Sequence, residues 1–341
     1  MNTGEDVHLT AARAGDQEAF QRLTEPYRRE LTLHGYRMLG SLQDAEDLLQ
    51  ETLLRAWRRL ETFRQSVSFR AWLYKIATNL SLDMLAKRPR RTLPALVGKA
   101  SDPNEPVAPP AQEPVWLDPV PEGWLADGEG NPETRFIARE TVSLAFLVAL
   151  QKLPPRQRAV LILCDVLDWR AGEMADLLGL TVSSVNSALH RARATMAGQP
   201  GIDGRGAVRI AESERLQSLL EQYMQAWESQ DIPRLVALLK EDAAFTMPPT
   251  PTWFQGRESI AAFIGREIFL PEGPRAFWRL VPTGANGQPA LAVYSRAGAG
   301  AFKAVTLQVM TLDPSGERIA GITSFLNPDL FRRFDLPAEL F

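Results

Sequence analysis

Hydrophobic positions in the first part of the chain recur every three to four residues, which is the spacing of amphipathic helices. Residues 45–63 carry one such stripe, and residues 69–88 carry another. Gly40 and Ser41 stand before the first stripe, where a glycine typically ends one helix and a serine caps the next. The pattern therefore predicts that the chain is helical up to about residue 95.

Helical spacing returns between about residues 134 and 200, and one stretch there has the outline of two short helices joined by a tight turn. The first of these helices is predicted over Ala171–Leu178 and the second over about Val182–Met196. Gly179 supplies the left-handed turn between them, and Thr181 can cap the second helix. This arrangement predicts a helix-turn-helix, whose second helix enters the major groove of DNA.

The last part of the chain, about residues 208–341, has a mixed pattern. Two amphipathic helices, a strand and a Pro-Pro stop come first, and a further helix follows in the stretch GRESIAAFIGREIF. Three apolar segments, FWRLVP, ALAVYSR and AVTLQVMTL, are then separated by the hairpin-like breaks GANGQP and RAGAGAF. Short apolar runs between such breaks are typical of strands. We predict an α+β domain here.

Proline and acidic residues dominate about residues 96–133, so this segment cannot hold long helices. We predict an extended linker between the two helical parts. Trp116 and Trp124 are unusual in a disordered linker, and we expect them to dock on a folded surface. The chain thus divides into residues 1–95, this linker, residues 134–200 and the α+β domain.

Charge is spread unevenly along a chain whose formal net charge is only −3. Residues 69–91 carry six basic residues and one acidic residue, whereas residues 101–135 carry eight acidic residues and one basic residue. The first segment suits a polyanion, and the second would repel one. The start MNTGEDVHLTAARAGD is unlike a signal peptide, and the apolar runs are too short to span a bilayer. With its single cysteine, Cys164, the chain is expected to be cytoplasmic and to contact no membrane.

Both predicted N-terminal helices carry polar residues opposite their buried stripes. On the first helix, Leu54 is an apolar residue among polar ones and hints at a partner surface, although an ordinary solvated face is the alternative. On the second, amide and hydroxyl groups lead into a basic run, a mixture that proteins use for bases and phosphates. The candidate residues are Asp47, Gln50, Glu51 and Leu54 for a partner, and Lys75, Thr78, Asn79, Ser81, Lys87, Arg88, Arg90 and Arg91 for DNA.

DAEDLLQETLLRAW followed by SFRAWLYKIATNLSLDMLAKR resembles region 2 of bacterial sigma factors of the extracytoplasmic-function (ECF) type. The resemblance implies that the helix with Asp47, Gln50 and Glu51 docks on the coiled coil of the clamp of the largest RNA polymerase subunit. It also implies that the next helix, with the loop 63–68 before it, receives the promoter −10 element as a melted strand. Extruding bases from the duplex costs a few kcal/mol, which stacking and pockets can return.

LPPRQRAVLILCDVLDWRAGEMADLLGLTVSSVNSALHRARATM resembles region 4 of the same sigma factors. This resemblance implies binding of the −35 element as duplex DNA and a contact with the polymerase flap. Helical spacing turns Val185, Leu189 and Ala192 inward. The residues left to contact DNA are Ser183, Ser184, Asn186, Ser187, His190 and Arg191, with Arg193 suited to a phosphate. No metal is expected, because His190 has no partner ligands in the sequence.

LLEQYMQAWESQDIPRLVALLKEDAAFTMPP and the segments after it resemble the SnoaL-like group, the cone-shaped α+β fold of polyketide cyclases and ketosteroid isomerases. In the isomerases, a tyrosine on the first helix pairs with an aspartate base on the first strand. Tyr223 fits the tyrosine, but the base position falls near Met247, where no carboxylate stands. Proton transfer needs a general base, so we expect no enzyme, no cofactor and no metal. A pocket with Tyr223, Met247, Trp253 and Trp278 would take an unknown small molecule, although core packing is the alternative.

These features predict an alternative sigma factor: all-α region 2 and region 4 modules followed by a SnoaL-like regulatory domain. It would bind core RNA polymerase and promoter DNA. A free-standing helix-turn-helix regulator is one alternative, but it leaves the acidic face on residues 45–63 without a role. A bifunctional protein with an active cyclase-like domain is another. The apolar stretch 327–341 is expected to pack on its own domain, with contacts to the sigma modules or the linker as the sharper hypothesis.

Overall fold

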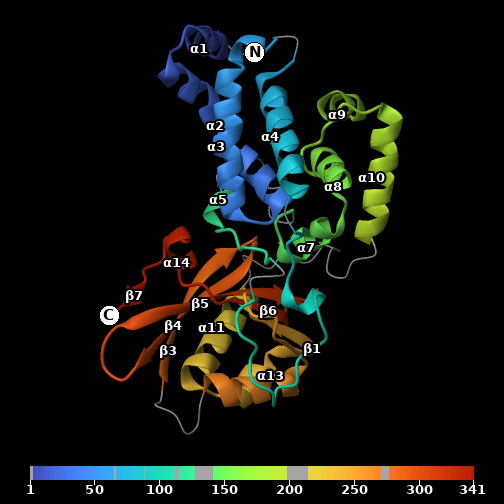
Figure 1. Ribbon diagram of the computed structural model, residues 1–341. Helices are drawn as coiled ribbons and strands as arrows, with labels where there is room; N and C mark the ends of the chain where they lie inside the picture. Colours follow the sequence, from blue (N-terminus) through green and yellow to red (C-terminus); the bar gives the residue numbers. More distant parts are fainter. Residues whose placement is uncertain are drawn as a thin grey trace. The chain divides into compact units, whose positions relative to one another are not determined.

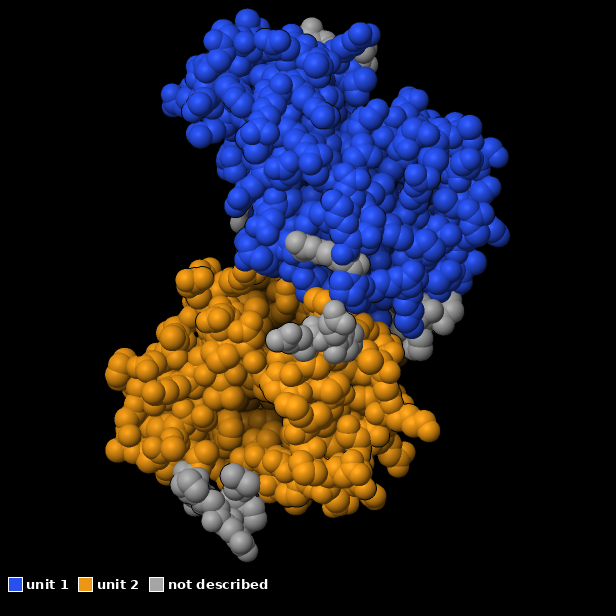
Figure 2. All heavy atoms as spheres, viewed as in Figure 1, with its two compact units in different colours: residues 1–91, 145–202 blue, residues 92–144, 203–341 orange. Residues whose placement is uncertain are grey.

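The computed structural model describes residues 3–64, 67–87, 89–111, 115–126, 141–197, 214–269 and 276–341. It forms two compact units, coloured separately in Figure 2. Unit 1 comprises Met1–Arg91 and Ala145–Ile202, and unit 2 comprises Thr92–Leu144 and Asp203–Phe341. Within the described residues, no helix has the length and apolar character needed to cross a membrane.

The N-terminal half of unit 1 is a bundle of helices whose ends follow the predicted signals (Figure 1). Asp16 caps the second helix by accepting from the backbone N–H groups of Glu18 and Ala19. Gly40 ends that helix in the left-handed conformation, with φ of 72°. Ser41 then caps the third helix, as predicted, by accepting from Asp44 N at 3.3 Å. The elements are α1 (Thr3–Arg13), α2 (Gln17–Leu39), α3 (Leu42–Arg58), the short η1 (Leu60–Thr62) and α4 (Phe69–Leu85).

The second half of unit 1 contains the predicted helix-turn-helix. Gly179 lies in the left-handed region with φ of 65°, and Thr181 Oγ1 accepts from Ser184 N at 3.1 Å. Both turn signals are therefore confirmed. The helix expected from residue 134 begins at Leu144 within the described residues, and residues 134–140 lie outside them. The elements are α7 (Leu144–Lys152), α8 (Pro155–Leu161), the π-helical turn η3 (Ile162–Val166), α9 (Ala171–Leu178) and α10 (Val182–Ala197).

Unit 2 is an α+β fold, as predicted, in which helices cover one face of a mainly antiparallel sheet (Figure 1). The strand order is β2-β1-β6-β5-β4-β3; β1 and β6 pair in parallel, and the other neighbours are antiparallel. Asn286 and Gly287 both have positive φ and make the tight turn between β3 and β4. The strands are β1 (Leu239–Thr246), β2 (Trp253–Gln255), β3 (Ala276–Ala285), β4 (Gln288–Ala297), β5 (Phe302–Leu312) and β6 (Ile319–Phe325).

The core of unit 2 lies between the sheet and its helices. Tyr223, Trp227, Phe245 and Phe263 are almost completely buried in it. Burial of such large side chains is the main stabilising contribution of a small α+β domain. The helices are α11 (Glu214–Ser229), α12 (Ile232–Ala237), α13 (Arg257–Phe263) with the π-helical turn η4 (Ile264–Ile268), and α14 (Leu330–Arg333).

The proline-rich segment expected as a linker is extended, but it packs on unit 2 instead of standing free. Its backbone donates from Ser101 N to Trp253 O at 2.8 Å and from Ala111 N to Pro249 O at 3.0 Å. Trp116 is buried, as predicted, and donates from Nε1 to Ala111 O. Backbone groups at strand ends and loops need hydrogen-bond partners. The extended proline-rich segment supplies such partners to unit 2 without forming a helix. This segment includes the short η2 (Pro94–Leu96) and α5 (Gly123–Ala126).

The last residues pack back on unit 2, as the plainer expectation had it, and they also line a hollow together with the tryptophan-bearing segment, which is one part of the sharper hypothesis. Tyr294 donates from its hydroxyl to Pro337 O at 2.9 Å, and its ring meets that of Phe331 edge-on at 5.1 Å. The two-residue strand β7 (Glu339–Leu340) pairs with β5. A hollow of about 320 Å³ lies where residues 333–335 meet residues 121–124. The C-terminal stretch and the tryptophan-bearing segment therefore contact the same part of unit 2.

Candidate polymerase and nucleic-acid interface

The four predicted partner residues lie on one solvent-facing side of α3. Asp47 and Gln50 are exposed, and Leu54 keeps 42% of its surface exposed. The opposite side of the helix packs inward with Ala45, Leu48 and other small or apolar side chains. An exposed leucine among carboxylate and amide groups is a surface that a partner could cover. The structure thus brings the four residues together on one surface.

The carboxylates on this surface of α3 interact with other side chains of the same helix. Glu51 pairs with Arg55 at 2.7 Å, and Asp47 accepts from Gln43 Nε2 at 3.2 Å. Both interactions join residues four apart, and such exposed pairs contribute only a few tenths of a kcal/mol. They can therefore be exchanged for contacts with a partner at little cost in stability.

Only part of the predicted −10 set is exposed on α4. Lys75 and Asn79, four residues apart, are exposed. Thr78 and Ser81 are fully buried, so the prediction that their side chains reach DNA is wrong. Thr78 Oγ1 is 2.9 Å from His34 Nε2 of α2, and Ser81 donates to Ala77 O in its own helix. Both hydroxyls therefore form hydrogen bonds in the interior of unit 1.

The basic run after α4 also contains both exposed residues and a residue that packs inside unit 1. Lys87 and Arg90 are exposed, and Arg88 lies outside the described residues. Arg91 instead forms an ion pair with Asp44 at 2.8 Å, with only 17% and 10% of the two side chains exposed. Arg91 is therefore a packing residue of unit 1, which corrects its assignment to DNA.

A partly buried polar network fixes α4 against α2. Arg70 donates to both carboxylate oxygens of Glu30 at 2.7–2.9 Å, and its guanidinium lies 5.0 Å from the centre of the Tyr74 ring. Burial, helped by the positive charges of Arg37 and Arg70, lowers the pKa of His34 to about 3. Burial raises the pKa of Tyr74. His34 is therefore neutral at neutral pH and can exchange a hydrogen bond with Thr78 without placing a further charge in the core.

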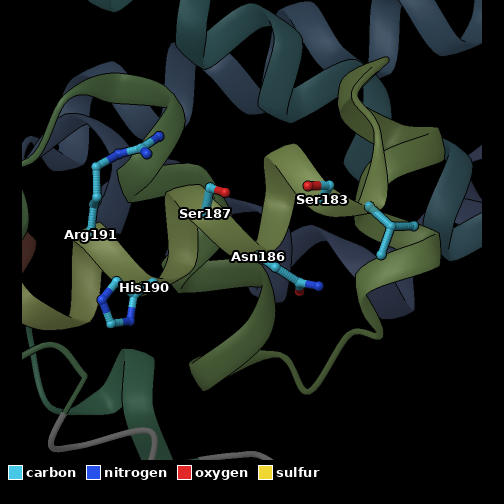
Figure 3. A pocket seen from close by; sticks show the side chains of 6 residues that line it. Ser183, Asn186, Ser187, His190 and Arg191 are labelled. Carbon is cyan, nitrogen blue, oxygen red and sulfur yellow. The ribbon is translucent and has the colours of Figure 1, made fainter.

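The recognition helix α10 presents its predicted polar residues to solvent (Figure 3). Val185, Ala188 and Ala192 pack inward, and Leu189 is only half-buried. Ser184 is exposed, but its hydroxyl lies 2.8 Å from Thr181 Oγ1 within the helix cap. The exposed side forms an open hollow lined by Val182, Ser183, Asn186, Ser187, His190 and Arg191.

Arg193, expected at a phosphate, has a protein partner. Its Nη2 lies 2.5 Å from Asp165 Oδ1, and its Nε donates to the other oxygen of the same carboxylate. Asp165 belongs to the π-helical turn before α9, so the pair ties the recognition helix to the helix that precedes the motif. The two residues are far apart in sequence, and no spacing rule could have joined them.

The candidate pocket residues of unit 2 belong to its packed interior or its edge. Tyr223 is fully buried and donates to Gln308 Oε1 at 2.9 Å, and burial raises its pKa. Met247 lies in the same core, with Trp278 packed against it. Trp253 instead donates from Nε1 to Gly98 O of the proline-rich segment. Among the residues that the structure describes, no cluster of His, Cys, Asp and Glu is placed to hold a metal.

Three stretches of the chain match known families. Residues 23–91 match Sigma-70 region 2, residues 143–196 match Sigma-70 region 4, and residues 220–322 match the SnoaL-like domain. The first match covers α3 and α4, the second covers the helix-turn-helix, and the third covers most of the sheet of unit 2. The three matches and the fold thus define a sigma factor with a SnoaL-like extension.

The chain belongs to the ECF RNA polymerase sigma factors. It is 43% identical, over 98% of its length and 90% of theirs, to the ECF RNA polymerase sigma factor SigG of two Mycobacterium tuberculosis strains. SigJ of the same organism is 26% identical over 90% of this chain and 91% of its own. The crystal structure of SigJ shares the fold with a TM-score of 0.58 at 22% identity, covering 91% of this chain and 97% of that chain.

Proposed function

We propose that this sigma factor reads duplex −35 DNA with the exposed side of α10. The observation that carries the proposal is the row of amide, hydroxyl, imidazole and guanidinium groups on that side, with small apolar residues packed behind it. Asn and Arg side chains can discriminate bases in the major groove through paired hydrogen bonds. Arg193 stays with Asp165 in this proposal and orients the helix.

The −10 strand would contact the exposed part of α4 and the start of the basic run. Lys75 and Asn79 lie on one exposed stripe, and Lys87 and Arg90 continue the positive charge beyond the helix. Lysine and arginine hold the backbone, whereas an amide can read a base edge. This reduced set replaces the larger one expected from helical spacing.

Core RNA polymerase would bind α3 through Asp47, Gln50, Glu51 and Leu54, at the clamp of the largest subunit. Unit 1 residues of the helix-turn-helix part would contact the flap. A free helix-turn-helix regulator would have no use for the α3 surface. The two alternatives therefore differ in whether the purified protein binds core polymerase.

Charge reversal on α3 tests this assignment. Asp47→Arg and Glu51→Arg each place a repulsive charge in the proposed interface and should abolish co-purification with core polymerase. Glu18→Arg, at an exposed position of α2 where the glutamate also pairs with an arginine four residues on, is the matched control and should bind normally. Co-purification with core polymerase measures binding, run-off transcription on a panel of promoters measures its consequence, and a thermal melt confirms folding. Wild-type binding by both α3 variants would show that α3 is not the polymerase surface.

We further propose that unit 2 regulates transcription in cis and is not a catalyst. Tyr223 is hydrogen-bonded to Gln308, and Met247 stands where a proton-transferring carboxylate would be required. A small-molecule ligand of this unit remains part of the proposal. Ending the chain after Leu326 removes the packed C-terminal stretch and should change run-off yield if unit 2 controls initiation.

A further inference from the structure

A cluster of arginine and phenylalanine side chains lies on unit 2, where β3, β4 and β5 run side by side (Figure 1). Trp278 and Leu280 of β3 pack in the core between the sheet and its helices. Side chains alternate along a strand, so the residues between these two and before them point to the opposite face. The arginine–phenylalanine cluster on that face consists of Phe277, Arg279, Arg296 and Phe302.

The register of the strands brings these four side chains together. Phe277 of β3 lies directly opposite Arg296 of β4 in the sheet. The guanidinium of Arg296 lies over two rings, 5.3 Å from the centre of Phe277 and 4.4 Å from that of Phe302. Arg279 lies over the Phe302 ring as well, at 5.9 Å. Stacking on aromatic rings restricts the orientation of a guanidinium and leaves its N–H edges free to donate.

The positive charge of the arginine–phenylalanine cluster is not neutralised by the rest of the described chain. Among the residues that the structure describes, neither Arg279 nor Arg296 forms an ion pair, and Nη1 of Arg296 donates to Gly300 O at 3.4 Å. The two arginines are diagonal neighbours on one face of the sheet, and like charges at such a separation repel. Phe277 beside them keeps 46% of its surface exposed. An anion placed between the two guanidinium groups would therefore be bound favourably.

A nucleic-acid backbone fits this surface better than a second copy of the chain does. The planar fork of a guanidinium matches the oxygens of a phosphate, and duplex DNA offers one negative charge for about every 1.7 Å of its length. The stacked rings already order the two arginines, which lowers the entropy lost on binding. A symmetric dimer through the same face would instead place arginines of one copy against those of the other, because such interfaces pair like patches.

We propose that the arginine–phenylalanine cluster is a DNA-binding surface, through which unit 2 contacts phosphates of promoter DNA whatever the base sequence. Because promoter DNA is the partner, this assignment rests on the proposed function, and it adds a third DNA surface to those of α4 and α10. Arg279 and Arg296 each donate to phosphate oxygens, and the rings of Phe277 and Phe302 hold the guanidinium groups in position. Unit 2 thereby strengthens every promoter complex alike and does not discriminate between bases.

Neutralising both arginines tests the surface. The probe is a labelled duplex without −35 or −10 sequences, bound by the full chain in the absence of polymerase. Each phosphate contact contributes about 0.9 to the slope of log affinity against log salt, so Arg279→Gln with Arg296→Gln should reduce this slope by about 2. From about 50 to 200 mM salt, the wild type should therefore lose about tenfold more affinity than the double variant. Equal slopes for the two proteins would overturn the proposal.

Two further variants separate a local contact from net charge and from misfolding. Arg215→Gln with Arg234→Gln removes the same charge from exposed positions on α11 and α12, and it should keep the wild-type slope. An equal reduction in this control would show that only net charge matters and would overturn the proposal. Arg279→Lys with Arg296→Lys keeps both charges and should retain most of the slope. The lysine variant also decides the question if a thermal melt shows that the glutamine variant is unfolded, since a slope reduced by about 2 despite both charges would contradict phosphate binding.

Other occupants of the surface give different results. If a second copy covers it, sedimentation of the wild type should show a dimer that Arg279→Gln with Arg296→Gln abolishes, while the DNA slope stays unchanged. If an acidic surface of polymerase covers it, co-purification with core polymerase should fall in the same variant, again with an unchanged slope. Either result would replace DNA as the partner and overturn the proposal.

Failure of this proposal is distinguishable from failure of the proposed function. If the proposed function is wrong, no promoter in the panel yields a product with the wild type and core polymerase does not co-purify. The polymerase-free measurement on the duplex still decides whether the cluster binds phosphates. If only the cluster is wrongly assigned, polymerase binds and transcription proceeds, but Arg279→Gln with Arg296→Gln binds DNA with the wild-type slope.

Discussion

The two helices proposed to contact DNA differ in how well their exposed residues could be predicted. On α10 the predicted contact residues are all exposed. On α4, Thr78 and Ser81 are buried, although they lie outside the expected core stripe. The difference follows from packing: α10 contacts α8 and α9, whereas α4 contacts α2, α3, α8 and α9. Helical periodicity identifies exposed residues reliably only when a helix is packed on one side.

Charge insertion at the buried hydroxyl of α4 should give the largest effect. Thr78→Asp places a carboxylate beside neutral His34 in a closed interior, and we expect the free energy of unfolding to fall by about 3 kcal/mol or more. Asn79→Asp, one residue further and exposed, is the control and should change it by less than about 0.5 kcal/mol. Chemical denaturation measures both. Similar stability of the two variants would mean that Thr78 is exposed.

Of the two arginines after α4, Arg91 should matter for stability and Arg90 for DNA binding. Arg91→Ala removes the largely buried ion pair with Asp44, and we expect a loss of about 2 kcal/mol in unfolding free energy. Arg90→Ala should leave stability unchanged but weaken all promoters alike and reduce the salt dependence of DNA binding. Denaturation curves and a salt titration of DNA affinity measure these effects. A loss of stability on the Arg90 change would contradict the assignment.

Protonation of His34 should make unit 1 sensitive to acid. The pKa of His34 is about 3 in the folded protein and 6.5 ordinarily. Between these two values the histidine is protonated in the unfolded chain but not in the folded one. The contribution of neutral His34 to the free energy of unfolding is therefore fully present above pH 6.5. It is lost as the pH falls toward 3, and the loss is about 2 kcal/mol at pH 5. Denaturation from pH 7 to pH 4 measures the slope. A His34→Gln variant that is folded at pH 7 should show a shallower slope, and an equal slope would exclude this histidine as its source.

Asn186→Ala should affect recognition and not stability. The residue is exposed on the recognition side of α10, and loss of a base contact should cost about 1–2 kcal/mol at the preferred −35 sequence. Less preferred −35 variants should lose less, so sequence tolerance broadens. Competition binding on a set of −35 variants measures this. Equal losses on every variant would assign Asn186 to the phosphate backbone instead.

The smallest expected effect belongs to Arg193. Its ion pair with Asp165 is 57% exposed on the arginine side, so Arg193→Ala should reduce stability by less than about 1 kcal/mol. Asp165→Ala should weaken −35 binding as much as Arg193→Ala does if the pair orients α10. If Arg193 instead contacts a phosphate directly, only Arg193→Ala should weaken −35 binding. Affinity measurements on the two single variants and the double variant distinguish the two roles.

The sequence by itself was enough to predict the elements and the family. Serine, threonine and glycine at Ser41, Thr181, Gly40 and Gly179 mark helix ends through bonds and backbone conformations that act over a few residues. The helix-turn-helix, the α+β unit and the absence of a carboxylate near Met247 follow from equally local patterns. The resemblance to sigma regions 2 and 4 rests on such stretches as well.

Only the tertiary structure decided which polar groups remain available. Thr78 is covered because His34 lies opposite it on α2, Arg91 is held by Asp44, and Lys75 reaches Asp176. The members of each pair lie tens of residues apart or more, so no helical or strand period relates them. The proline-rich segment packs on unit 2 for the same reason, since its hydrogen-bond partners come from strands and loops far along the chain. Periodicity records which side of an element is apolar, whereas the neighbours that bury its remaining sides are determined only when distant segments pack.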